Sequence, residues 1–166
     1  METAALASSI LPIPVHDMWR YGDDTYIDRR LGFSLRPPAG WRFANVTPEA
    51  MRPIGTVVEW LSGERDVAAC ALWTGTDSEG TARVEQVLDL QIRRIFDAAE
   101  MADPERHPVQ LAGRPAQKLV WIGDTTVVEA IILSDGPWTY WLVGSWLGNE
   151  SATWFRDAVE SFALVE

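Results

Sequence analysis

Mainly apolar runs of strand length fill the stretch from Pro115 to Leu147, which predicts three consecutive β-strands. These runs are interrupted twice, at Ile122-Gly123-Asp124-Thr125 and at Ser134-Asp135-Gly136-Pro137. Each interruption has a glycine beside a turn-forming residue, as is typical of a β-hairpin. With Gly123 and Asp124 as the first turn, Lys118 lies directly opposite Glu129. An opposite-charge pair across two strands supports this register and predicts a three-stranded meander.

The second turn, taken at Asp135 and Gly136, places Ile131 opposite Tyr140 and gives the meander two unlike faces. One face is almost entirely apolar and comprises Leu119, Trp121, Val128, Ala130, Ile132, Trp141 and Val143. The other is apolar with charges at its centre and comprises Lys118, Val120, Glu129, Ile131, Trp138, Tyr140, Leu142 and Trp146. We call this second set the Glu129 face.

The Glu129 face predicts a binding surface for a protein or a hydrophobic peptide segment. Apolar contacts would supply affinity, while Lys118 and Glu129 would fix the orientation of the partner. Glu59, expected on the same side of the sheet, is included in this predicted surface. An exposed apolar face also favours self-association, so a homodimer is a second expectation. The alternative is that the terminal helix covers the face completely and makes it part of the core.

The rest of the sequence predicts two short hairpins, one long helix and a terminal helix. The hairpins are expected within 25–36 and 56–73. Apolar residues at three- and four-residue spacings predict a helix over 81–101 that packs onto a sheet, and Asn149 is suited to cap a helix from Glu150 to about Phe162. Short connections favour antiparallel pairing. The expected fold class is therefore α+β: a largely antiparallel sheet with both helices packed on it, as an α/β/α sandwich.

Length and composition indicate one folded domain. The 166 residues, 47% apolar and 23% charged, are ordinary for a globular protein with a hydrophobic core. We expect an N-terminal arm over residues 1–22, interrupted by prolines, and a single domain over 23–166. A short helical turn is expected from Thr47 to Met51. Because the chain has nine tryptophans, a few of them are expected at the surface.

The charge and the cysteine content narrow the class of partner. A net charge of −10 argues against nucleic acid, because phosphate binding needs clustered Lys and Arg. No apolar run is long enough for a membrane span. The single cysteine, Cys70, permits neither an intrachain disulfide nor a thiolate-rich metal site. Since the first residues also lack the basic region of a secretory signal, we expect a cytoplasmic protein.

The sequence offers little catalytic chemistry. His16 and His107 are the only imidazole bases and neither stands in a recognisable motif, so we assign no catalytic residue and expect no enzyme. Zinc-ligand spacings and phosphate-binding glycine motifs are missing, which leaves no metal and no cofactor to expect. The alternative class is a small hydrolase or lyase, or a carbohydrate-binding domain, that places Glu129 or Glu59 beside aromatic side chains.

Three stretches resemble the PsbP-like fold superfamily. Gly32-Phe33-Ser34-Leu35-Arg36-Pro37-Pro38-Ala39-Gly40-Trp41 matches the Gly-Phe opening of that family, which ends in Pro-x-Gly-Trp. Gly113-Arg114-Pro115-Ala116 matches a Gly-x-Pro-Ala step into a strand, and Ser161-Phe162 matches the Ser-Phe pair that ends the terminal helix. With the long helix between them, the likeness covers residues 25 to 163.

The resemblance implies an α+β sandwich and a mostly non-enzymatic role. The superfamily includes photosystem accessory proteins, DcrB-like proteins and the Eag chaperones of bacterial type VI secretion, which hold hydrophobic helices on an open sheet face. A cytoplasmic chaperone or adaptor, linked to bacterial secretion, is the relative that best fits the Glu129 face. A shared fold does not by itself transfer a function.

Overall fold

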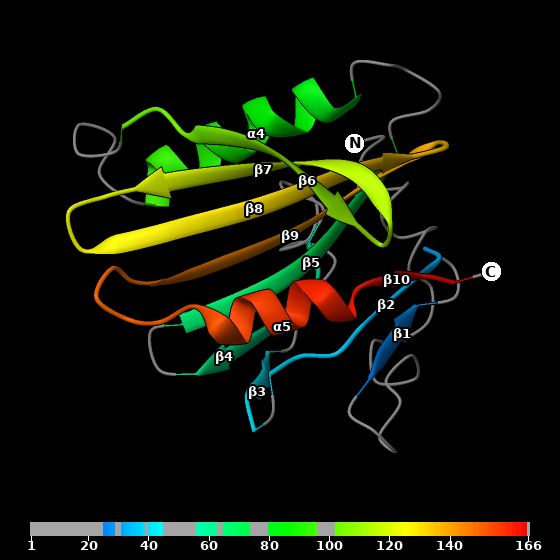
Figure 1. Cartoon of the computed structure of the whole chain (residues 1–166), viewed down its shortest axis with the longest axis horizontal. Coiled ribbons are helices and arrows are strands. Elements are labelled where there is room, and N and C mark those ends of the chain that lie inside the picture. Colours follow the sequence, from blue (N-terminus) through cyan, green and yellow to red (C-terminus); the bar gives the residue numbers. More distant parts are fainter. Residues whose placement is uncertain are drawn as a thin grey trace, which may run out of the picture.

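The computed structural model describes residues 25–28, 31–38, 40–44, 56–62, 65–73, 80–95 and 102–165. The expected N-terminal arm and the helical turn expected at Thr47 lie outside these residues. Within them the chain forms ten strands and two helices (Figure 1). In chain order these are β1 (Tyr26–Asp28), β2 (Phe33–Leu35), β3 (Arg42–Ala44), β4 (Thr56–Ser62), β5 (Arg65–Trp73), α4 (Gly80–Ile95), β6 (Glu105–Leu111), β7 (Arg114–Ile122), β8 (Thr126–Asp135), β9 (Trp138–Leu147), α5 (Thr153–Ser161) and β10 (Ala163–Leu164).

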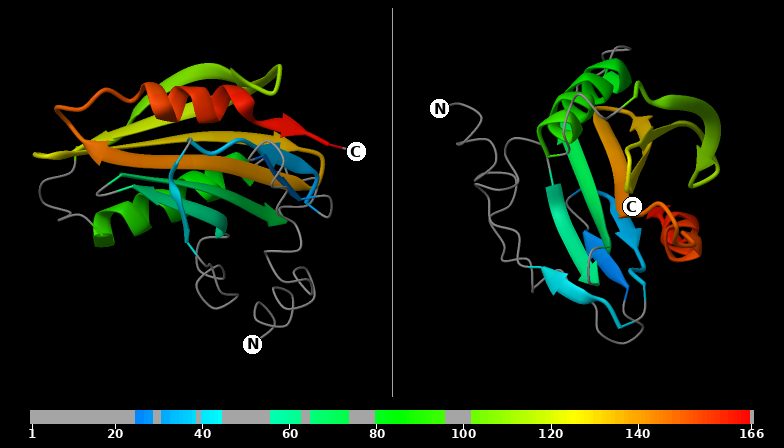
Figure 2. Two further views of the ribbon diagram at one scale, coloured as in Figure 1. Left: turned by 90° about the horizontal axis from the view of Figure 1, so that it is seen from below. Right: turned by 90° about the vertical axis from the view of Figure 1, so that its left-hand side faces the viewer.

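The strands form two sheets in which every described pair is antiparallel. Seven strands make the main sheet in the order β3-β4-β5-β9-β8-β7-β6, and β2 lies between β1 and β10 in a small sheet. The long connection through α4 carries the chain from β5 to the edge strand β6. Figure 2 shows α4 on one side of the main sheet and α5 on the other. The predicted α+β class, with a helix on each face, is confirmed.

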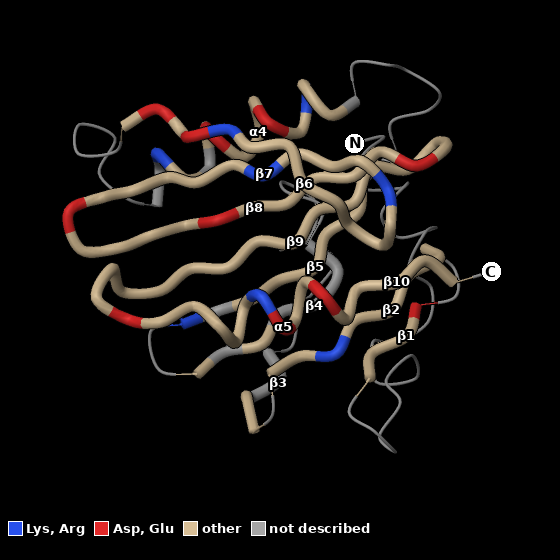
Figure 3. The backbone as a smooth tube through the Cα atoms, in the orientation of Figure 1, with Lys and Arg blue, Asp and Glu red and all other residues tan. Residues whose placement is uncertain are grey.

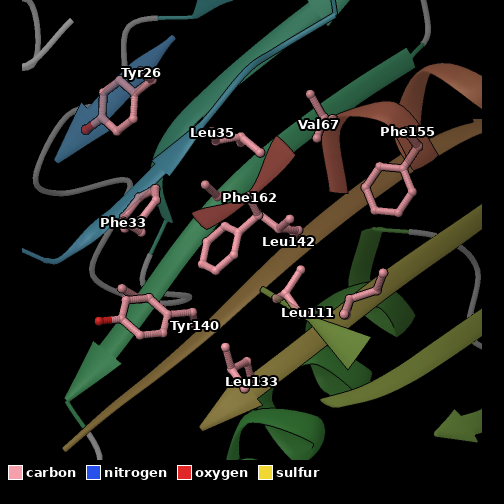
Figure 4. Packing of buried hydrophobic residues seen from close by; sticks show 14 of the residues in the cluster. Tyr26, Phe33, Leu35, Val67, Leu111, Leu133, Tyr140, Leu142, Phe155 and Phe162 are labelled. Atoms are coloured by element: carbon pink, nitrogen blue, oxygen red, sulfur yellow. The ribbon is translucent and has the colours of Figure 1, made fainter. Parts of the chain in front are cut away.

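Each face of the main sheet has its own hydrophobic core. On the α4 side, three helix residues at four-residue spacing, Val84, Leu88 and Ile92, pack against the apolar face of the meander. On the α5 side, side chains from the small sheet, from α5 and from β5, β8 and β9 meet in the larger cluster shown in Figure 4. The sheet is therefore buried along its middle strands on both sides.

Both turns of the meander lie one residue later in the chain than predicted. The N–H of Gly123 donates to the carbonyl of Thr126 at 2.8 Å, so the first turn consists of Asp124 and Thr125. Asp135 pairs with Trp138, which makes Gly136 and Pro137 the second turn. The positive φ of Gly136, 57°, suits the first position of a turn whose second position is proline.

The displaced turns change the predicted pairs but not the faces. Glu129 pairs directly with Val120, so Lys118 is its diagonal neighbour and not its direct partner, and Ile131 pairs with Leu142 and not with Tyr140. Moving a turn by one residue changes the register by two, and side chains alternate with a period of two. Each predicted face therefore keeps its members.

The terminal helix does not begin where the sequence predicts. Asn149 lies in the turn after β9, where the N–H of Gly148 donates to Thr125 and the N–H of Glu150 donates to Leu147. The residue at the N-cap is Ala152, which makes no side-chain cap hydrogen bond. Because residues 148–150 are used to close the turn, α5 starts only at Thr153.

The edge strand β6 is joined to β7 by a two-residue turn, Ala112-Gly113, with φ values of 53° and 73°. Two successive positive φ values are the signature of a type I′ hairpin, in which the flanking residues, here Leu111 and Arg114, form a hydrogen-bonded pair. Hydrogen-bonded pairs then recur every second residue. Pro108 therefore falls at a position where a backbone N–H would point toward the open edge, and proline has none.

Candidate functional site

The helix α5 covers the part of the Glu129 face that belongs to β9. Phe155 packs against Trp146 with ring centroids 5.7 Å apart. The helix can approach this closely because β9 has Gly144 beneath it: a Cβ added there would lie 2.5 Å from Cδ1 of Phe155. A single missing side chain thus lets an aromatic ring lie directly on the strand.

The small sheet and the end of α5 cover the same face further along β9. Phe162 contacts the ring of Tyr140 at 6.0 Å and stacks on Phe33 at 5.7 Å. The hydroxyl of Tyr140 donates to the carbonyl of Leu31 at 2.6 Å. Burial raises the pKa of Tyr140, with a smaller contribution from nearby carboxylates. Tyr140 is a hydrogen-bonded core residue.

Four of the nine residues of the predicted binding surface are therefore core. The exposed fractions are 5% for Ile131, 4% for Tyr140, 1% for Leu142 and 6% for Trp146. A partner cannot reach these four side chains while α5 is in place, so their assignment to a binding surface is corrected. Trp138 is half-buried, against the same cluster.

Three members of the Glu129 face, Lys118 and Val120 on β7 and Glu129 on β8, stay partly accessible on the side of the sheet that carries α5. Figure 2 shows β6 and β7 curling toward that side, so that they flank α5 across the sheet. We define the β7–β8 patch by the partly exposed residues that meet there: Glu105 and His107 on β6, Lys118, Val120 and Ile122 on β7, Glu129 on β8 and Arg156 on α5. The charged positions of the chain are otherwise gathered mainly on helices and near strand ends (Figure 3).

Glu129 is the centre of this patch. Its side chain is 20% exposed, and its ion-pair partner is Lys118, whose Nζ lies 3.8 Å from Oε1. That separation is too long for a hydrogen bond. Burial raises the pKa of the Glu129 carboxyl group above its usual value, although Lys118 acts in the opposite direction. The positive charge of Arg156, and that of His107 when its imidazole is protonated, also favour the ionised form without reversing the effect of burial.

The sequence did not mark His107 or Arg156 as members of the site. His107 pairs with Lys118 across β6 and β7, and its Nε2 lies 3.5 Å from Oε2 of Glu105. Arg156 follows Phe155 and projects from α5 on the β8 side, where its charge acts on Glu129. The alternation of side chains along β6 could have placed His107 on the Glu129 side of the sheet. Arg156 could not have been found in this way, because only the packing of α5 on the sheet brings it near Glu129.

Glu59 does not belong to this patch. The backbone register pairs it with Ala68, which is part of the core under α4, whereas Glu129 belongs to the opposite side of the sheet. The expectation that Glu59 shares a face with Glu129 is wrong, because the hairpin of β4 and β5 sets the opposite parity. The two carboxylates do not form a catalytic pair.

A second group of polar residues joins α4 to the edge of the sheet. The indole N–H of Trp121 donates to Asp89 at 3.0 Å, and Nε of Arg93 donates to both of its carboxylate oxygens. Burial alone would raise the pKa of Asp89, but the hydrogen bonds from Trp121 and Arg93 lower it below its usual value. Glu85 forms an ion pair with Arg106 of β6. These contacts fasten the helix to the sheet.

Three of these residues, Glu85, Asp89 and Arg106, also line a cavity of about 390 Å³ on the α4 side, together with Leu119. This cavity could not be predicted from the sequence, because its walls come from the helix α4 and from residues of and next to the edge strand β6, which are separated along the chain. Its charged groups bind one another, and Glu129 does not line it. Among the described residues, no cluster of metal-ligating side chains is found.

Three of the described tryptophans, Trp41, Trp138 and Trp154, are partly exposed, as the count of nine predicted. The rings of Trp41 and Trp154 contact each other with centroids 4.5 Å apart, and the guanidinium of Arg65 lies over Trp41 at 5.2 Å. Trp154 in turn contacts Trp146 of β9, with ring centroids 5.6 Å apart.

In the described part of the chain, neither helix has the length and apolar character needed to cross a membrane. No protein-family model matches the sequence, and no curated protein is significantly similar to it.

Solved structures do resemble the fold. The cyanobacterial PsbP protein (CyanoP) of Synechocystis sp. PCC 6803 has a TM-score of 0.60 at 15% identity, over 84% of this chain and 91% of that one. A protein of Bacteroides thetaiotaomicron has a TM-score of 0.56 at 10% identity, over 88% of this chain, which spans half of its length. LpqN, involved in cell envelope biogenesis of Mycobacterium tuberculosis, has a TM-score of 0.48 at 13% identity. Together with the two-sided helix packing, the first of these similarities establishes that the chain has a PsbP-like fold.

Proposed function

We propose that this protein is a non-catalytic binding protein, of the adaptor or chaperone type, that holds a segment of another protein on the β7–β8 patch. The observation that supports this most strongly is Glu129, a largely buried carboxylate without a hydrogen-bond donor from the described residues, beside solvent-accessible apolar side chains. Ile122 is 49% exposed and Val120 is half-buried next to it on the same side of β7. Incompletely satisfied polar groups next to apolar surface are typical of a site that is completed by a partner.

A non-catalytic role fits the chemistry of the patch. Glu129 has a raised pKa, as a general acid does, but it lines no described cavity that would hold a substrate. The single cysteine, Cys70, is buried and has no disulfide partner in the chain, which supports the cytoplasmic setting included in this proposal. A link to secretion is left out, because fold likeness does not transfer function.

The proposal is tested by adding a charge to one exposed aliphatic side chain on each face of the molecule. Ile122→Asp alters the β7–β8 patch, and Leu90→Asp is the matched control on α4, where Leu90 is 61% exposed. Peptides selected from a random library against the wild type should bind Ile122→Asp at least tenfold more weakly and Leu90→Asp unchanged. Equal binding to both variants would contradict the proposal.

Self-association is the other expected use of an exposed apolar patch. Native mass spectrometry of the same two variants separates it from partner binding. A dimer that is lost only in Ile122→Asp identifies a second copy of the chain as the occupant, and a monomer that binds peptides supports the adaptor role.

A further inference from the structure

We propose that the partner segment presents a lysine or arginine side chain to Glu129, flanked by apolar side chains that contact Val120 and Ile122. This inference names the chemistry of the occupant and rests on the proposed function of the β7–β8 patch.

The described residues around Glu129 supply no hydrogen-bond donor to its carboxylate. Its neighbour on β9 is Gly144, over which the ring of Phe155 lies, and its neighbour on β7 is Val120; neither side chain has a polar group. The ammonium group of Lys118 stays at 3.8 Å. A carboxylate held among apolar groups gains more from a further charged donor than one in water, because few water molecules compete for it.

The charge balance points in the same direction. Lys118 and Arg156 act on Glu129 through their charge alone, since neither donates a hydrogen bond to it in the described structure, so the carboxylate can still accept a charged donor. The net charge of −10 attracts a basic segment and raises its rate of encounter.

An acidic segment and a purely apolar segment both fit the β7–β8 patch less well than a basic one. An acidic segment would bring carboxylates close to Glu129 and to Glu105, and would be repelled by the chain as a whole. A purely apolar segment would remove the remaining 20% of exposed Glu129 surface and supply no donor in exchange. Burying a charge without a partner is unfavourable, so such a segment would bind weakly.

The test uses a random peptide library displayed on phage and selected against three forms of the full chain. These are the wild type, Glu129→Gln and Glu160→Gln, the last of which removes the same charge from an exposed position of α5. Peptides selected on the wild type should be enriched in Lys or Arg beside apolar residues. The Lys and Arg enrichment should disappear with Glu129→Gln and persist with Glu160→Gln.

A binding measurement on one selected peptide completes the test. Replacing its lysine by norleucine, or its arginine by citrulline, should weaken binding to the wild type about tenfold and leave binding to Glu129→Gln unchanged. Circular dichroism confirms that the variants are folded.

Each contrary result overturns the inference. Equal Lys and Arg enrichment on the wild type and on Glu129→Gln, a pool rich in Asp and Glu, or a pool no different from the starting library would each contradict it. If Ile122→Asp still abolishes binding in the first two outcomes, the proposed function stands and only the basic partner is wrong. If Ile122→Asp has no effect, the proposed function fails as well.

Discussion

The contact between α5 and β9 can be tested by adding one methyl group at Gly144. The Cβ of an alanine there would lie 2.5 Å from Cδ1, 2.7 Å from Cε1 and 3.1 Å from Cγ of Phe155. The ring cannot stay where it is, and Phe155 is 2% exposed, with core on its other sides. Gly144→Ala must therefore displace either the ring or the helix.

The expected cost follows from this overlap. Inserting a methyl group into a packed core costs about 1–3 kcal/mol. For a domain of this size, each 1 kcal/mol lowers Tm by roughly 2–4 °C, so Gly144→Ala should melt about 2–12 °C below the wild type. Gly148→Ala is the matched control, since its Cβ would lie 3.7 Å from the Thr125 carbonyl and 3.8 Å from Val127. That variant should stay within about 1 kcal/mol of the wild type.

A double-mutant cycle identifies the ring as the cause. Phe155→Ala alone should cost about 3–5 kcal/mol, and Gly144→Ala should add little to it once the ring is gone. Thermal and urea melts of the four proteins measure the coupling. Equal stabilities of Gly144→Ala and Gly148→Ala would refute the close packing of α5 on β9, and would return the β9 part of the Glu129 face to the accessible surface.

Three further variants test the polar groups and the sheet edge. Because burial raises the pKa of Glu129, ionisation of this carboxyl group opposes folding. Glu129→Gln should therefore be more stable than the wild type at neutral pH. Below pH 4.5, the usual pKa of a glutamate, thermal melts of the two proteins should show no difference. Ionisation of Asp89 stabilises the fold instead, since hydrogen bonds including that of Trp121 lower its pKa. Asp89→Asn should therefore lower the free energy of unfolding by about 1 kcal/mol at neutral pH. This difference from the wild type should vanish as the pH falls below 3.8 and through the lowered pKa. A pH-independent difference in either variant would contradict the assigned cause. Pro108→Val restores a donor to the open edge of β6 and should increase self-association in sedimentation measurements, whereas Pro115→Val on β7 should behave as the wild type does.

The sequence determines the faces of the meander more firmly than its register. Both turns were predicted one residue early, because a glycine in a hairpin break does not say which position of the turn it occupies: Gly123 precedes the first turn, and Gly136 is the first residue of the second. Pro137 held the better signal: with its φ fixed near −65°, it suits the second position of a turn that follows Gly136. The faces survived the error, since a register change of two residues leaves the alternation intact.

The cover of the Glu129 face could not be predicted from its own strands. An apolar strand face indicates that the face is buried. It does not distinguish burial by a helix of the same chain from burial by a partner protein. The decisive residue is Gly144, which appears in the sequence only as a gap in an apolar strand. Gly144 matters for the packing only because Phe155 lies on it, and the position of Phe155 depends on where α5 begins after the turn that follows β9.

The charged centre of the Glu129 face nevertheless held information about where that cover ends. Lys and Glu are almost never fully buried unless they are paired, because removing a charge from water is costly. An apolar face that is interrupted by Lys118 and Glu129 can therefore not be covered completely at these two residues. In the structure β9, which has no charged residue between Trp138 and Leu147, is largely buried on this face, whereas the side chains of Lys118 and Glu129 stay 31% and 20% exposed. The core continues past β9 through Ile131, Leu133 and Leu111, so the charges leave an accessible area around themselves and not along the whole of β7 and β8. A charge within an apolar strand pattern thus marks the boundary between core and surface, and the surface just beyond the boundary is where a partner can bind.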